Sequence, residues 1–106
     1  MDILGMMKKA QAMQAKLQEA QDELGQMEVS GASGGGMVCV TMTGKGDLKR
    51  LAIDPSLLTP SDKEMVEDLI VAAFADAKAK AERAATEKMQ ELTAGLPLPA
   101  GMKLPF

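Results

Sequence analysis

The residues that most resemble a chemical motif are the glycines and lysine within residues 30–54, SGASGGGMVCVTMTGKGDLKRLAID. Glycine-rich loops that end in Lys followed by Ser or Thr cradle phosphates, because glycine lets backbone N–H groups approach the phosphate closely. That motif needs a glycine five positions before Gly44, where this chain has Cys39. Gly46 also follows Lys45 in place of Ser or Thr. We therefore expect a strand connection and a hairpin turn here, and no phosphate loop.

Side chains suited to acid–base, nucleophilic or metal chemistry are scarce. The 106 residues contain no histidine and one cysteine, Cys39. The commonest general base, the commonest metal ligand and a Cys–His nucleophile are therefore excluded. Carboxylates gather within residues 62–68, where the dipole at the start of a helix favours negative charge. The sequence predicts that the protein is not an enzyme and uses no cofactor or metal.

Basic residues are the remaining candidates for a function, and they gather on a few segments although the net charge is −3. Phosphate binding needs lysines and arginines along a surface, without further chemistry. A charged row is also typical of a solvated helix face with i,i+4 ion pairs. The chain has two aromatic residues, both Phe, so base stacking on aromatic side chains is not expected.

The first group of lysines lies on a predicted helix over about residues 2–25. Apolar residues recur there in steps of three and four, from Ile3 through Met13 to Leu24. This spacing forms a seam along one side of the helix, and such a seam is typical of a helix that packs against another helix.

Strands are predicted over about residues 28–53, with GKGD as a hairpin turn. In MVCVTMT, alternation places Val38, Val40 and Met42 on one face. In the returning strand, alternation places Leu51 and Lys49 on one face and Arg50 on the other.

A long helix is predicted over about residues 61–92, with Thr59 as its cap and Pro60 in its first turn. Its first half carries an apolar stripe, and its second half is rich in alanine and charge. Residues 96–106, LPLPAGMKLPF, indicate an extended Pro-rich tail. The single domain is therefore expected to span residues 1–95.

The length of this helix predicts an oligomer. About 32 residues of helix span about 48 Å, whereas a compact domain of about 100 residues has a radius of gyration near 13 Å. One chain cannot bury such a helix, and three strands leave open sheet edges. A two-fold dimer is the simplest arrangement that resolves both.

Three segments in order, GGGxVxVxxxGxG, IDPSLL and EDLIxAA, carry a resemblance that runs nearly from end to end. By these segments the chain resembles the YbaB/EbfC family of bacterial nucleoid-associated DNA-binding proteins. The resemblance implies an α+β fold, an α-β-β-β-α protomer with a small antiparallel sheet, and a homodimer whose long helices project as arms. It also implies binding of double-stranded DNA without enzymatic activity, and a role in nucleoid organisation or gene regulation.

By the same resemblance, the arms would contact DNA phosphates through Lys8, Lys9 and Lys16 on the first helix and Lys78, Lys80 and Arg83 on the last. The contacts are expected to go mostly to the DNA backbone with weak sequence preference, because neither helix carries the Asn, Gln and Arg cluster of strong major-groove readout.

The rival hypothesis is a protein-interaction module. Its Met-rich helix seam would dock a replication or recombination-repair protein, with DNA contact incidental. The single cysteine fits a reducing compartment. We expect no leader, because Met1 is followed at once by a polar helical pattern, and no apolar run approaches about 20 residues. We expect a cytoplasmic protein associated with the nucleoid and not with a membrane.

Overall fold

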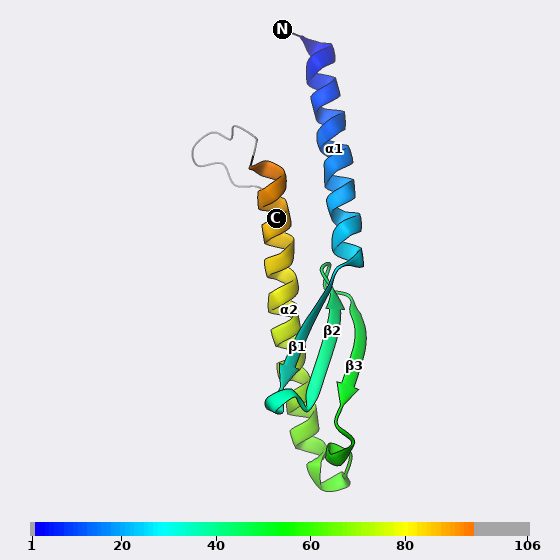
Figure 1. The fold of residues 1–106 in the computed structure, drawn as a ribbon, viewed down its shortest axis with the longest axis vertical. Helices are drawn as coiled ribbons and strands as arrows, with labels where there is room; N and C mark the ends of the chain where they lie inside the picture. The colour runs from blue at the N-terminus through cyan, green and yellow to red at the C-terminus, as the bar shows by residue number, and fades with distance from the viewer. Residues whose placement is uncertain (1, 95–106) are drawn as a thin grey trace.

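The computed structural model describes residues 2–94, and the predicted tail lies outside them. Two long helices run side by side at one end, and a three-stranded sheet packs on the second helix at the other end (Figure 1). This α-β-β-β-α order confirms the predicted fold. The helices and strands are α1 (Ile3–Gln26), β1 (Glu28–Ser33), β2 (Val38–Thr43), β3 (Leu48–Ile53) and α2 (Lys63–Thr93).

Helix α1 has defined contacts at both ends. The Asp2 carboxylate accepts a hydrogen bond from the Gly5 N–H at 3.0 Å, so an otherwise unpaired donor of the first turn is satisfied. At the other end the Gly44 N–H donates to the carbonyls of Leu24 (2.9 Å) and Met27 (3.0 Å). The hairpin turn is thus attached to the point where α1 meets β1.

The sheet is antiparallel in the order β1-β2-β3. Val40 lies opposite Gly31 on β1 and opposite Leu51 on β3. The glycines between β1 and β2 form a tight turn, with φ of 59°, 68° and 96° at Gly34, Gly35 and Gly36. Glycine adopts positive φ without steric cost, so the run is a specific turn of the sheet.

Helix α2 covers the inner face of β1 and β2. Val38, Val40 and Met42 point to this face, as predicted, and are almost completely buried against Ala73 and Ala77. The start of α2 differs from expectation: Thr59 donates to the Asp62 carboxylate at 3.0 Å in a short 3₁₀ turn, and the helix begins at Lys63. The whole of β3 remains exposed or half-buried.

A second, smaller core joins the two helices. Ala20 and Leu24 of α1 pack on Met89 of α2, with Leu17 and Leu92 at the margin. Beyond this contact α1 continues toward its N-terminus, and no other helix or strand of residues 2–94 lies beside it (Figure 1). The radius of gyration is 19.6 Å, well above the value of about 13 Å for a compact domain of this length. The helices therefore form a projecting arm.

Candidate nucleic-acid interface

The six basic residues predicted to contact DNA are all exposed. Three of them lie on α1, where Lys8, Lys9 and Lys16 are the sole charged side chains between Ile3 and Gln18. Among residues 2–94, neither Lys8 nor Lys9 forms an ion pair. This segment therefore presents concentrated positive charge to solvent.

Lys80 of α2 has a structural role in the fold. Its ammonium donates to the Ser30 carbonyl at 2.9 Å and lies 3.4 Å from the Asp76 carboxylate. Asp76 in turn accepts from the Ala32 N–H at 3.0 Å, and this bond, with help from Lys80, lowers the pKa of Asp76. Both backbone groups belong to the edge of β1 that faces away from β2. Asp76 and Lys80 thus cap a sheet edge. Asp76 is separated from Ala32 by 44 positions in the sequence, and Lys80 from Ser30 by 50.

Lys78 and Arg83 are placed differently from Lys80. Neither forms an ion pair within residues 2–94. Lys78 lines a groove of about 610 Å³ between α1, the hairpin turn and α2, where Lys45 is its basic partner. Sequence reasoning noted Lys45 on the hairpin but had no signal that would bring it to Lys78, because the two meet through tertiary packing.

Lys88 is a residue whose role the sequence did not reveal. It bridges the two helices by an ion pair with Glu23 of α1, and a second carboxylate, Glu91, lies 3.8 Å away. The hydrogen bond to Glu23 raises the pKa of Lys88. A notch between the two helices is lined by Lys16, Glu19 and Glu23 of α1 and by Lys88 and Glu91 of α2. Because carboxylates surround the notch, the positive field of α1 is strongest nearer its N-terminus, at Lys8 and Lys9.

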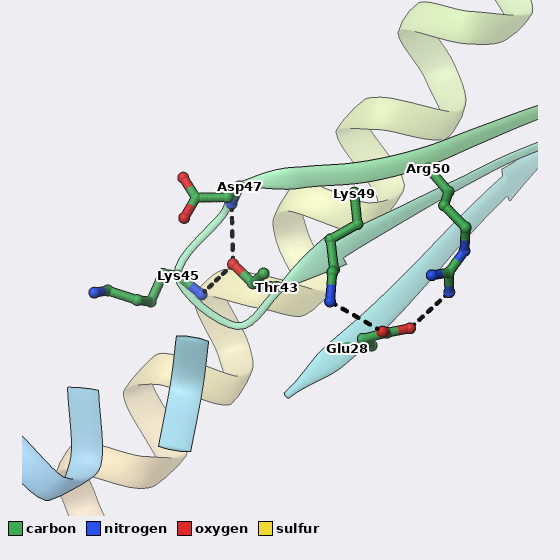
Figure 2. Close-up of polar contacts among 6 residues, drawn as sticks. All are labelled: Glu28, Thr43, Lys45, Asp47, Lys49 and Arg50. Atoms are coloured by element: carbon green, nitrogen blue, oxygen red, sulfur yellow. Dashed lines mark hydrogen bonds and ion pairs between the residues drawn. The ribbon is translucent and has the colours of Figure 1, made fainter. Parts of the chain in front are cut away.

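The two basic residues of β3 share one acidic partner. Figure 2 shows the Glu28 carboxylate held between Arg50 at 2.7 Å and Lys49 at 3.4 Å. The hydrogen bond from Arg50 is the main cause that lowers the pKa of Glu28. Strict alternation placed Lys49 and Arg50 on opposite faces, but a bulge at Thr41 and Met42 interrupts the register there. Both side chains consequently reach the same carboxylate.

The hydroxyl of Thr43 helps to fix the hairpin turn that carries Lys45. Thr43 Oγ1 accepts from the N–H groups of Lys45 and Asp47, both at 3.2 Å (Figure 2). Thr43 itself is buried. The backbone beneath Lys45 is therefore fixed, and its exposed side chain remains available to solvent.

The described part of the chain has neither a metal-binding cluster nor a helix that could span a membrane. Within residues 2–94 no three His, Cys, Asp or Glu side chains gather closely enough to hold a metal ion. Neither α1 nor α2 has an apolar stretch long enough to cross a bilayer. Cys39 is half-buried, with its Sγ 3.5 Å from the Gly36 carbonyl.

The family profile and the most similar relatives agree on one family for this chain. The profile of the YbaB/EbfC DNA-binding family matches residues 1–96. Proteins named "Nucleoid-associated protein" are 58% identical in Brucella ovis and 57% identical in Brucella anthropi, over 99% of this chain and 98% of theirs. The crystal structure of an uncharacterized protein from Helicobacter pylori superposes with a TM-score of 0.77 at 27% identity, covering 87% of this chain and 97% of that one. The chain belongs to the YbaB/EbfC DNA-binding family.

Proposed function

We propose that the protein binds double-stranded DNA as a homodimer, chiefly through contacts to the phosphate backbone. The observation that carries the proposal is the segment Ile3–Gln18 of α1, which bears three lysines and no acidic residue and whose N-terminal part projects beyond α2. Each lysine that neutralises a phosphate releases condensed counterions, and this release drives binding whatever the base sequence. Weak sequence preference follows from the same physics.

The remaining predicted contacts contribute unequally. Lys78, beside Lys45, and Arg83 are exposed and form no ion pair within residues 2–94, so they are available for phosphates. Lys80 is committed to the edge of β1. Its charge adds to the local field, but a direct phosphate contact would compete with the hydrogen bond to Ser30. We therefore rank Lys8 and Lys9 first and Lys80 last.

Uncovered apolar surface supports the homodimer. Leu51 lies opposite buried Val40 but is 45% exposed, because α2 does not extend over β3. On α2, Val71 is 69% and Phe74 is 39% exposed. Apolar surface of this kind is typical of a contact between subunits. A second copy related by a two-fold axis would cover the inner face of β3 and place two arms on one molecule.

The biological setting is inferred from the relatives. Proteins at 58% identity over nearly the full length carry the name "Nucleoid-associated protein". We infer that this protein also resides on the bacterial nucleoid in the cytoplasm and contributes to nucleoid organisation or gene regulation. Non-catalytic binding fits this role, since backbone contacts alone suffice to coat or bridge DNA.

A protein-interaction module for replication or recombination-repair proteins remains the second candidate. The observation that favours it is the exposure of large apolar side chains on α1, including Ile3 at 67% and Leu4 at 71%. DNA contact would then be incidental, and removing the lysines would leave the main activity intact.

The experiment that separates these functions replaces Lys8 and Lys9 by Ala in the full chain. Binding to a fluorescent duplex is measured by anisotropy at several salt concentrations. In a dimer the change removes up to four phosphate contacts, so the slope of log affinity against log salt should become less steep by as much as about 3.6.

Lys63→Ala is the matched control. Lys63 is also an exposed helical lysine, but it lies at the start of α2, at the end of the molecule away from the arm. It should leave both affinity and slope unchanged. Equal effects of the two variants, or no effect of either, would contradict binding by the α1 arm.

A further inference from the structure

The start of α1 has two unlike sides. Four large apolar side chains there are more than half exposed: Ile3 (67%), Leu4 (71%), Met6 (58%) and Met7 (55%). At about 100° per residue they lie on one side of the helix. By the same geometry Lys8, Lys9 and Lys16 lie on the opposite side, and no acidic residue is present between Ile3 and Gln18. This part of α1 is therefore a basic amphipathic helix.

The apolar side of this segment has no partner within the described fold. Along residues 2–94 no other helix or strand lies beside it, since the contact with α2 is centred farther along α1, at Ala20 and Leu24 (Figure 1). Exposed apolar residues that stand singly are ordinary on a protein surface, but a contiguous patch marks an interaction surface. The four side chains lie within residues 3–7 and form such an apolar patch.

The charge around the apolar patch selects the kind of partner. The three lysines are exposed, and the nearest carboxylate, Asp2, accepts a hydrogen bond from the Gly5 N–H at the start of the helix. A second α1 segment would bring like charges together, which opposes binding. Duplex DNA would bind the lysines through its phosphates but leave the apolar patch exposed to water. A bilayer that contains anionic lipids offers both an apolar interior and negatively charged headgroups.

We propose that this part of α1 binds the surface of a bilayer rich in anionic lipids, with the apolar patch among the lipid chains. An interfacial helix lies in the membrane plane and sinks about 5–10 Å into the boundary between headgroups and chains. The long lysine side chains can then reach the headgroup phosphates. The contact goes beyond DNA binding and does not depend on it.

This proposal differs from the expectation that the protein does not associate with a membrane. That expectation considered only segments long and apolar enough to cross a bilayer, and neither helix of residues 2–94 is one. A helix that lies on the surface needs no such segment, because its polar side stays in water.

Co-sedimentation of the full-length protein with vesicles tests the proposal. Vesicles of phosphatidylglycerol and phosphatidylcholine in equal parts should bind the wild type, and binding should weaken as salt screens the lysines. Vesicles of phosphatidylcholine alone should bind it at least about tenfold more weakly, because basic residues are attracted to an anionic surface. The test variant is Leu4→Gln with Met7→Gln, which removes apolar surface, keeps every lysine and introduces good helix formers. It should bind the mixed vesicles at least about tenfold more weakly than the wild type.

Leu58→Gln with Met65→Gln is the matched control. It makes the same two substitutions at residues that are 65% and 44% exposed and lie outside α1, so it should bind vesicles as the wild type does. The test variant should keep its affinity for duplex DNA within about twofold, because all of its lysines remain.

Wild type that sediments no better with the mixed vesicles than with phosphatidylcholine alone would overturn the proposal. So would a test variant that binds them as the wild type does, since the attraction would then be purely electrostatic. If the wild type bound no vesicles and the test variant had a lower mass in light scattering, a second copy would cover the patch, and the proposal would be wrong. Vesicle binding that depends on Leu4 and Met7 would support it even without duplex binding, an outcome that would contradict only the proposed function.

A fluorescent label identifies the inserted side of α1. With Cys39→Ala as background, an environment-sensitive dye is attached at Met7→Cys or, as the control, at Ala12→Cys, which is exposed on the side of the lysines. The emission of the dye at position 7 should shift to the blue with the mixed vesicles, and that at position 12 should not. Equal shifts at both positions, or no shift at position 7, would contradict insertion of the apolar patch.

Discussion

Gly31 lies where β1 crosses α2 and the two backbones approach closely. A Cβ atom placed there would lie 2.2 Å from the Ala77 nitrogen and 2.4 Å from the Ala73 oxygen. Contacts this short cannot be relieved by a rotamer change, because both partners are backbone atoms of a helix. The small residues at 31, 73 and 77 together let the strand lie directly on the helix.

Replacing Gly31 by Ala should therefore force β1 and α2 apart. We expect a loss of about 3 kcal/mol in the free energy of unfolding, at the upper end of overpacking effects. Urea denaturation at fixed protein concentration measures it. Gly25→Ala is the control, because its Cβ would meet nothing nearer than a flexible Lys45 side chain at 3.4 Å, and the change removes a helical glycine. A Gly31→Ala variant as stable as Gly25→Ala would refute the close-packing argument.

Residue types alone predicted which side chains could bind DNA phosphates, but not which of them already form contacts within the fold. Lys78 and Lys80 are indistinguishable in the sequence AKAKAE. Their difference arises from contacts with β1, and Lys80 reaches Ser30 across 50 positions. The helix phase relative to the sheet decides this, and local patterns do not encode it.

At the scale of elements, α2 packs on the sheet with its first half and on α1 with its second half. Its first half buries β2 through Ala73 and Ala77, and Asp76 and Lys80 satisfy the outer edge of β1. An edge strand with free backbone groups is a site for unwanted pairing. The cap leaves β3 as the uncovered side of the sheet.

Acid should weaken this cap. The Ala32 N–H and Lys80 hold the pKa of Asp76 below its ordinary value, which is about 3.9 for Asp. A carboxylate with a lowered folded-state pKa adds stability that is present above the unfolded-state pKa and lost as pH falls through the folded one. The stability difference between wild type and Asp76→Asn should therefore be constant above about pH 5 and shrink below about pH 4. Thermal unfolding from pH 7 to pH 2.5 measures it, and a difference independent of pH would contradict the role of the cap.

The helices, strands and hairpin were predictable because their signals are local. The α1 seam, the alternation around Val40 and the glycines of the hairpin each lie within a few residues of one another. The bulge that brings Lys49 to Glu28 was not predictable. It depends on how two strands align across the hairpin, and no residue in either strand marks it.

At the scale of the molecule, the arm and the uncovered sheet face call for a second copy. The length argument predicted that one chain cannot bury the helix over about residues 61–92. The second half of α2 instead packs on α1, and the part that projects is the N-terminal part of α1. The homodimer itself stays a prediction. Light scattering after size exclusion at micromolar concentration should give about twice the chain mass, and Leu51→Lys with Phe74→Lys should reduce it to one chain. A wild-type monomer under these conditions would contradict the two-armed arrangement.

Salt dependence of DNA binding tests the central claim most directly. For a dimer that uses two or three lysines of each protomer, log affinity for a duplex should fall against log salt with a slope of about −4 to −5, at about −0.9 per phosphate contact. Anisotropy titrations with duplexes of unrelated sequence should give nearly the same slope and affinity. The absence of binding to any duplex at about 50 mM salt, where backbone contacts are strong, would contradict the account.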